Sequence, residues 1–141
     1  MPPQGITGRN GFAPPGEKRE DDGRTPIGLF PLESAFGQDP SINSAMPYRQ
    51  ASENDLWVDD LQSPNDNTWV KRGQTSATSF ETMKPADIRC RHGIVAGCNR
   101  TPLIKGNGSG IFIHAWREDG CTTSQSMILQ DGFSQTARLE D

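Results

Sequence analysis

Residues 105–127 read KGNGSGIFIHAWREDGCTTSQSM and gather chemically active side chains around one apolar strand. Alternation along that strand places Phe112 and His114 on the same face. A histidine near the end of a buried strand can direct its imidazole into a cleft, where it can act as a general base. The alternative is a half-buried histidine that bonds a backbone carbonyl. A general base calls for a nucleophile in the following loop, where Cys121 and Ser126 are the candidates.

The two candidate nucleophiles differ in what they need from their surroundings. A thiol of pKa about 8.5 becomes a thiolate readily beside an imidazole, so Cys121 needs little help. However, Glu118 and Asp119 lie close before it, and their negative charge raises a thiol pKa. Ser126 needs a well-placed base and a third group that orients this base. The local sequence therefore leaves both residues open as nucleophiles.

The rest of the chain predicts a β-rich fold. A second buried strand is expected at 93–98, and turn residues at 99–102 and 106–109 separate it from the strand at 110–116. The apolar run at 25–32, which breaks at Pro31, predicts a strand of four or five residues near a sheet edge. Further short strands are predicted at 56–60, 68–71 and 127–129, loops at 1–25 and 37–47, one helical turn at 79–83 and a polar helix from about Asp131.

Length and composition narrow the class of protein. The 141 residues are enough for a single domain, 1–141, and 15 Gly and 11 Pro indicate many turns rather than a helical bundle. A net charge of −4 with scattered Lys and Arg argues against binding of nucleic acid. No apolar run is long enough to span a membrane, and no signal peptide is expected in the chain. The chain has three cysteines, an odd number that would leave one unpaired, so a disulfide scaffold is not expected.

Two further groups of residues have a functional and a structural interpretation. Cys90, His92, Cys98, His114 and Cys121 supply enough ligand atoms for one zinc ion, but their spacing matches no tight zinc motif, so no metal is expected. Cys90 and Cys98 are more simply small strand residues. The mixed-sign run at 18–24, KREDDGR, can cradle a carboxylate, although such runs are most often solvated.

Four separated blocks of sequence resemble one known family in order and spacing. They read GRNGF…EKREDDGRTPIGLFPLESAFG, then MPYRQ…NDLWVDD…SPNDNTWV, then RHGIVAGCNRTP, then GNGSGIFIHAWREDG…TTSQSM. Together they resemble the YkuD-type L,D-transpeptidase catalytic domain over residues 8 to about 129. The resemblance is specific because four separated blocks agree with the family, so it does not depend on any one of them.

The resemblance implies a sandwich-like, mostly β domain that acts on peptidoglycan stem peptides. In this family a cysteine, assisted by a histidine, attacks a peptide carbonyl, and the acyl group passes to an amine or to water. The expected partners are therefore stem peptides in the cell envelope or periplasm, and no cofactor is implied. Members extend further at both ends, so the domain is expected to be truncated there, with edge strands missing.

Carried over by position, the family histidine falls on His114, and the Gly-Cys pair that holds the nucleophile falls on Gln125 and Ser126. Residues expected to shape the site and contact substrate are Ser109, Trp116, Arg117 and Thr123. Cys121 lies too early in the family register to replace the missing thiol. A hydroxyl in place of a thiol implies an inactive or much weakened enzyme. The alternative is a module that binds peptidoglycan without turnover, or a degenerate remnant.

Overall fold

The computed structural model describes residues 5–84, 92–116 and 127–130, with backbone alone for 5–6, 115–116 and 127–130. Every regular element in these ranges is a strand, which confirms the predicted mostly β class. The strands are β1 (Gly5–Ile6), β2 (Phe12–Ala13), β3 (Thr25–Pro26), β4 (Leu32–Gly37), β5 (Tyr48–Gln50), β6 (Asp55–Val58), β7 (Trp69–Lys71), β8 (Phe80–Thr82), β9 (His92–Ala96), β10 (Phe112–Trp116) and β11 (Met127–Gln130).

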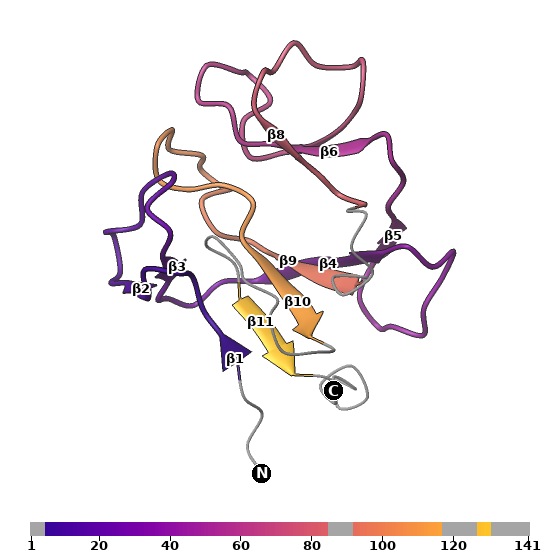
Figure 1. The fold of residues 1–141 in the computed structure, drawn as a ribbon, viewed down its shortest axis with the longest axis horizontal. Coiled ribbons are helices and arrows are strands. Elements are labelled where there is room, and N and C mark those ends of the chain that lie inside the picture. The colour runs from indigo at the N-terminus through magenta and orange to yellow at the C-terminus, as the bar shows by residue number, and fades with distance from the viewer. Residues whose placement is uncertain (1–4, 85–91, 117–126, 131–141) are drawn as a thin grey trace.

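The largest sheet has six strands in the order β1-β11-β10-β9-β4-β5 (Figure 1). β10 lies in its interior, antiparallel to β9 and parallel to β11. In this register, His114 lies opposite Gly93 on one side and Ile128 on the other. Hydrogen-bonded strands on both sides therefore fix the backbone that carries His114.

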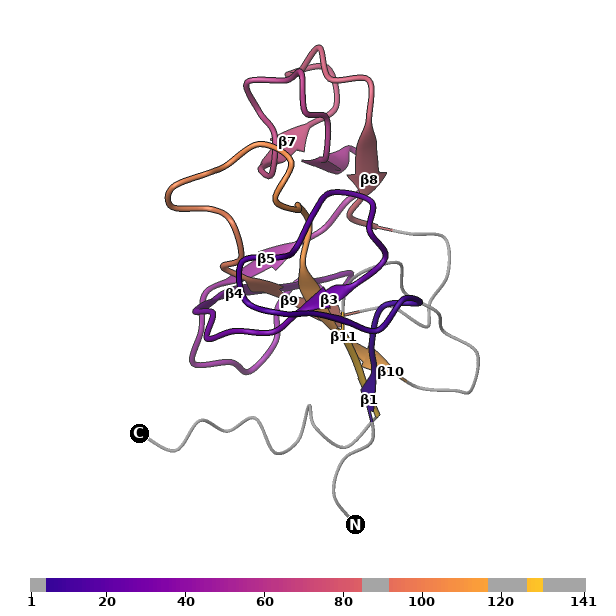
Figure 2. The ribbon, with the colours of Figure 1, turned by 90° about the vertical axis from the view of Figure 1, so that its left-hand side faces the viewer.

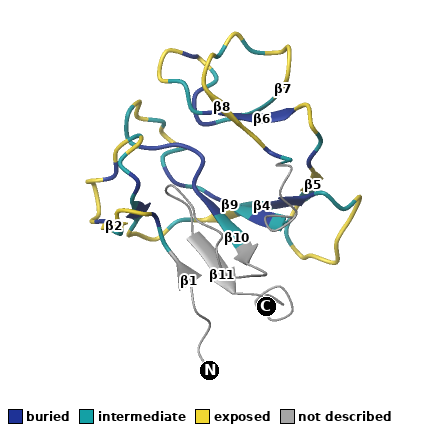
Figure 3. Cartoon of the chain, viewed as in Figure 1, coloured by how far each residue is buried: buried dark blue, intermediate teal, exposed yellow. Residues whose placement is uncertain are grey.

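A second sheet of three strands, in the order β7-β6-β8, lies across from the large sheet (Figures 1 and 2). All four residues of β6 are buried (Figure 3). The main hydrophobic cluster joins the two sheets and contains Phe36, Ala51, Trp57, Met83, Val95 and Phe112, with Trp69 packed against it. Because apolar side chains of both sheets meet there, this layer is where burial stabilises the fold most.

Five of the predicted strands are confirmed, because short apolar runs bounded by turn residues are a local signal for strands. The predictions at 56–60, 68–71, 93–98, 110–116 and 127–129 correspond to β6, β7, β9, β10 and β11. The polar helix predicted from about Asp131 lies outside the described residues.

Two local predictions are wrong. Residues 79–83 form no helical turn, because β8 pairs there with β6 and places Phe80 opposite Val58. An isolated turn of helix is marginal, and a neighbouring strand offers the backbone better hydrogen bonds. The apolar run at 25–32 is also not one strand: β3 ends at Pro26, Leu29 is fully exposed, and β4 begins only at Leu32. β4 then continues to Gly37 and pairs with β9.

Candidate active site

His114 projects from β10 into an aromatic environment. Its ring meets the rings of Phe36 and Phe112 edge to face, at centroid distances of 6.2 and 5.8 Å. Burial lowers the pKa of His114 to about 4. The Nδ1 atom is buried, and no described group forms a hydrogen bond with it. His114 is therefore neutral near pH 7, and its buried Nδ1 has no hydrogen-bond partner among the described residues.

The strand that pairs with β10 beside His114 is β11, and it directly follows the candidate nucleophile Ser126 in the sequence. β11 begins at Met127, whose Cα pairs with that of Ile113. Ser126, Arg117, Thr123 and the alternative nucleophile Cys121 lie outside the described residues. Trp116 is described by its backbone, which ends β10 opposite Gln130. The described part of the candidate site thus consists of His114, the candidate base, and the strands β10 and β11.

Ser109 lies at the start of the segment that becomes β10, and it is fully buried. Its Oγ donates a hydrogen bond of 2.9 Å to Oε1 of Glu20, and the backbone N of Glu20 donates to the carbonyl of Gly106 at 2.8 Å. Burial raises the pKa of Glu20 more than the hydrogen bond from Ser109 lowers it. The observed contact of Ser109 is thus with Glu20, and its contact with substrate stays a prediction.

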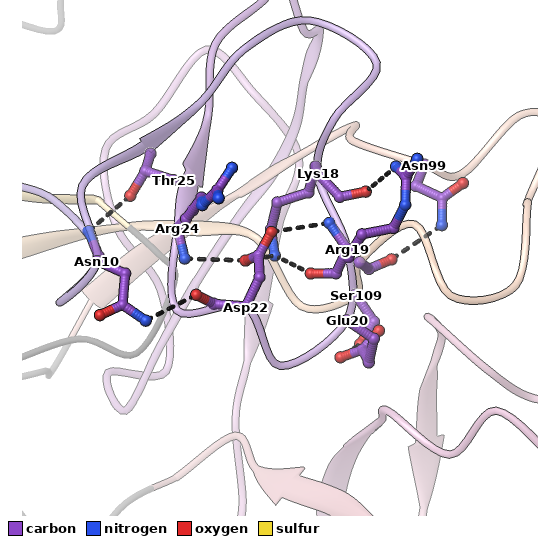
Figure 4. A network of polar contacts seen from close by, with 11 residues as sticks. Asn10, Lys18, Arg19, Glu20, Asp22, Arg24, Thr25, Asn99 and Ser109 are labelled. Atoms are coloured by element: carbon purple, nitrogen blue, oxygen red, sulfur yellow. Dashed lines mark hydrogen bonds and ion pairs between the residues drawn. The ribbon is translucent and has the colours of Figure 1, made fainter.

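The charged run at 18–24 is not simply solvated, contrary to the interpretation favoured above. Lys18 is only 6% exposed, and its Nζ lies 2.6 Å from Oδ1 of Asp22 (Figure 4). Burial raises the pKa of Asp22, but hydrogen bonds from Lys18 and from the backbone of Arg19 and Arg24 outweigh it and hold this pKa below its usual value. The Lys18 stem also packs where a Cβ on Gly108 would lie, at 3.1 Å. Residues of the run at 18–24 therefore contact residues 106–109, the segment before β10, and hold the N-terminal loop in place against it.

Asn67 was not predicted as anything more than a turn residue, yet it joins several parts of the site. It is 3% exposed, and its Oδ1 accepts from Trp57 Nε1 at 3.1 Å and from the backbone N of Gly110 at 3.0 Å. Its Nδ2 donates to the carbonyls of Cys98 and Asn99 at 3.2 and 2.8 Å. The one local signal for this residue is its type, since Asn is common in turns with positive φ.

The potential zinc ligands fall partly outside the described residues, namely Cys90 and Cys121. Among the residues that the structure describes, no three His, Cys, Asp or Glu side chains are grouped so that they could hold a metal ion. His92 instead pairs with Asp39, with 2.7 Å between Nε2 and Oδ2. Cys98 is buried and unbridged.

Comparison with known proteins gives one match. Residues 5–133 match the family model of the YkuD L,D-transpeptidase catalytic domain. Neither the curated proteins nor the solved structures gave a match. Within the described ranges, no helix is long and apolar enough to cross a membrane.

Proposed function

The chain belongs to the YkuD family of L,D-transpeptidase catalytic domains, and from this premise we propose that it performs slow acyl transfer on peptidoglycan stem peptides. In this proposal His114 is the general base and Ser126 is the nucleophile. Ser109, Trp116, Arg117 and Thr123 shape the site and contact the peptide. The place of action is the cell envelope, where peptidoglycan lies.

The state of His114 is the observation that carries the proposal. Its ring is neutral at physiological pH, and its Nδ1 is buried without a described hydrogen-bond partner. A buried ring nitrogen that no described group engages can accept a proton from a nucleophile that reaches it. Ser126 directly precedes β11 in the chain, and Met127 pairs with the neighbour of His114. This register supports a role for residue 126 beside the imidazole.

The proposed reaction has two balanced steps. In the first, Oγ of Ser126 bonds to the carbonyl carbon of the donor peptide and its proton passes to His114. The C–N bond then breaks, and the leaving amine takes that proton. In the second, an acceptor amine or water attacks the resulting ester and gives its proton to His114, which returns it to Oγ as the ester bond breaks. The product is a cross-link or a hydrolysed peptide.

Three features make this reaction slow. The hydroxyl of Ser126 ionises far less readily than the thiol found at this position in the family. His114, with a pKa of about 4, is a weak base because the most effective bases have a pKa near the working pH. Gln125 also places a side chain where the family has Gly, next to backbone N–H groups that can stabilise an oxyanion. Changes in such groups typically cost about 10²-fold or more in rate.

A second function is favoured by the same substitution. A groove that keeps its binding residues but has lost the thiol can hold stem peptide without turning it over. Binding of the purified protein to isolated peptidoglycan sacculi, with no release or cross-linking of peptides, is the result expected of such a module.

Acylation by a β-lactam of the carbapenem class tests the catalytic proposal. Incubation followed by intact-protein mass spectrometry should show little adduct on the natural chain within minutes. The Q125G/S126C variant should form the adduct at least about 10²-fold faster, because it restores the thiol and the unobstructed backbone. Adding H114Q to the Q125G/S126C variant should abolish the increase in the rate of adduct formation.

The cysteine at position 121 provides the matched control. Repeating the experiment in a C121S background should change nothing, and peptide mapping should place the adduct on residue 126. An adduct on Cys121, or fast acylation of the natural chain, contradicts the proposed assignment. If Q125G/S126C also remains unmodified while the protein binds sacculi, the non-catalytic function replaces the catalytic one.

A further inference from the structure

We propose that Asn67 is a positioning residue for His114, because it fixes the Trp57 ring and the start of the β10 segment relative to each other and so sets where the imidazole lies. The inference rests on the proposed function, in which His114 is the base. Asn67 itself lies in the turn between β6 and β7, on the sheet opposite the one that carries His114.

The hydrogen bonds of Asn67 show why its side chain has this effect. Its single carbonyl oxygen accepts from both the Trp57 indole and the Gly110 backbone, so these two groups are held by the same atom. Its NH₂ group donates to two carbonyls of the turn after β9. All four hydrogen-bonding positions of the amide are therefore used, and the partners leave only one orientation for it.

A continuous line of packed groups leads from this amide to the imidazole. A Cβ placed on Gly110 would lie 3.3 Å from Cδ1 of Trp57, so the Gly110 backbone packs directly against the indole. The Trp57 ring meets Phe112 edge to face at 5.1 Å, and Phe112 meets His114 at 5.8 Å. Because packed interiors transmit displacement, a shift of the indole reaches the imidazole through one intervening ring.

Position 67 requires a residue that adopts a positive φ and whose side chain both accepts and donates hydrogen bonds, and other residues meet these requirements less well than Asn. Asn67 has a φ of 56°, a region that Asn adopts more readily than most residues. Asp supplies the acceptor but cannot donate, and it adds a buried charge. Ala supplies neither and is strained at this φ. Gly relieves the backbone strain but removes the side chain, which makes N67G the most informative variant.

The position of His114 can be followed directly, because the chain has only two histidines. Proton NMR titration of the natural full chain and of N67G should resolve the imidazole signals of His114 and His92. In N67G the Trp57 and Phe112 rings lose their fixed position and water reaches His114. Its pKa should then rise from about 4 by about one unit or more toward the ordinary 6.5.

Asn99 provides a matched control, since it has nearly the same φ, 55°, and its side chain also bonds a loop, while the backbone carbonyl that accepts from Asn67 is still present in N99G. Its amide contacts Ile104 and Gly108 and neither Trp57 nor Gly110. N99G should therefore leave the His114 titration unchanged. An equal shift of His114 in N99G would mean general loosening and would overturn the proposal.

A milder variant decides the question if N67G does not fold. W57F keeps an aromatic ring but removes the indole N–H that Asn67 holds, so it should raise the His114 pKa by a smaller amount in the same direction. An unchanged His114 pKa in the folded variants overturns the positioning role. The NMR titration of His114 requires no acylation. It therefore tests the positioning role of Asn67 even if the protein proves to have no catalytic activity.

Discussion

At the scale of single residues, the main feature is a histidine held neutral by its surroundings. Phe36 and Phe112 pack edge to face against the His114 ring, and burial is the cause of its lowered pKa. A group with a lower pKa in the folded state than in the unfolded state binds fewer protons when folded. Protonation at acidic pH therefore favours unfolding, which couples the state of the candidate base to the stability of the whole domain.

This coupling predicts a specific dependence of stability on pH. The contribution of His114 is fully present above its unfolded pKa of 6.5 and is lost as the pH falls toward 4. The loss is on the order of 3 kcal/mol in the free energy of unfolding. Urea unfolding at pH 7, 5.5 and 4.5 should show this loss for the natural chain and a shallower one for H114Q. Parallel curves for the two proteins would contradict the prediction.

At the scale of elements, the pairing of β4 with β9 determines how closely the aromatic layer approaches the sheet. Gly93 of β9 lies opposite Phe36 of β4. A Cβ on Gly93 would come within 2.5 Å of Cζ of Phe36, which is closer than van der Waals contact permits. Glycine is therefore required at this place in the strand by the packing of a neighbouring ring, and that ring also contacts His114.

This packing predicts that G93A destabilises the protein by about 1–3 kcal/mol through overpacking. The cause can be separated from a general effect of the substitution by a double-mutant cycle with F36L, which removes the clashing ring atoms. In the F36L background, G93A should cost less than half as much, measured by urea unfolding. An equal cost in both backgrounds would show that Phe36 is not the reason for the glycine.

At the scale of the whole molecule, one buried carboxylate ties the two sheets together. Asp55 of β6 is fully buried and lies 2.8 Å from Lys71 of β7 and 3.5 Å from Arg49 of β5, the edge strand of the large sheet. Burial raises the pKa of Asp55, but hydrogen bonds from Lys71, Trp69 and Ser52 outweigh it and hold this pKa far below its usual value. Removing the charge should therefore weaken the contact between the sheets.

We expect D55N to lower the free energy of unfolding by about 2–4 kcal/mol at pH 7, because buried donors lose a charged acceptor. The contribution of Asp55 is full above its unfolded pKa of 3.8 and decreases as the pH falls below it, so the two proteins should converge in acid. Glu33, which pairs with Arg100 nearer the surface, is the control, and E33Q should cost about 1 kcal/mol or less. Thermal and urea unfolding measure both variants, and equal losses of stability in D55N and E33Q would contradict the prediction.

Several strands and the family of this protein follow from local patterns in the sequence. Short apolar runs bounded by turn residues identified β6, β7, β9, β10 and β11, since this signal lies within the residues of each strand. Residue order and spacing identified the family, and His114 as the candidate base. In contrast, β8 looked like a helical turn, because its pairing with β6 is set by residues about twenty positions away.

The polar residues that support the candidate site are identified by long-range contacts that exist only in the folded protein. Asn67 and Gly110 are 43 positions apart, and Glu20 and Ser109 are 89 apart, so no local pattern links either pair. Their side chains would be ordinary turn or surface residues if the sheets did not bring them together. Burial then removes water as a competitor and leaves each polar group only the partner that folding supplies, which is why these contacts depend on the fold rather than on residue type.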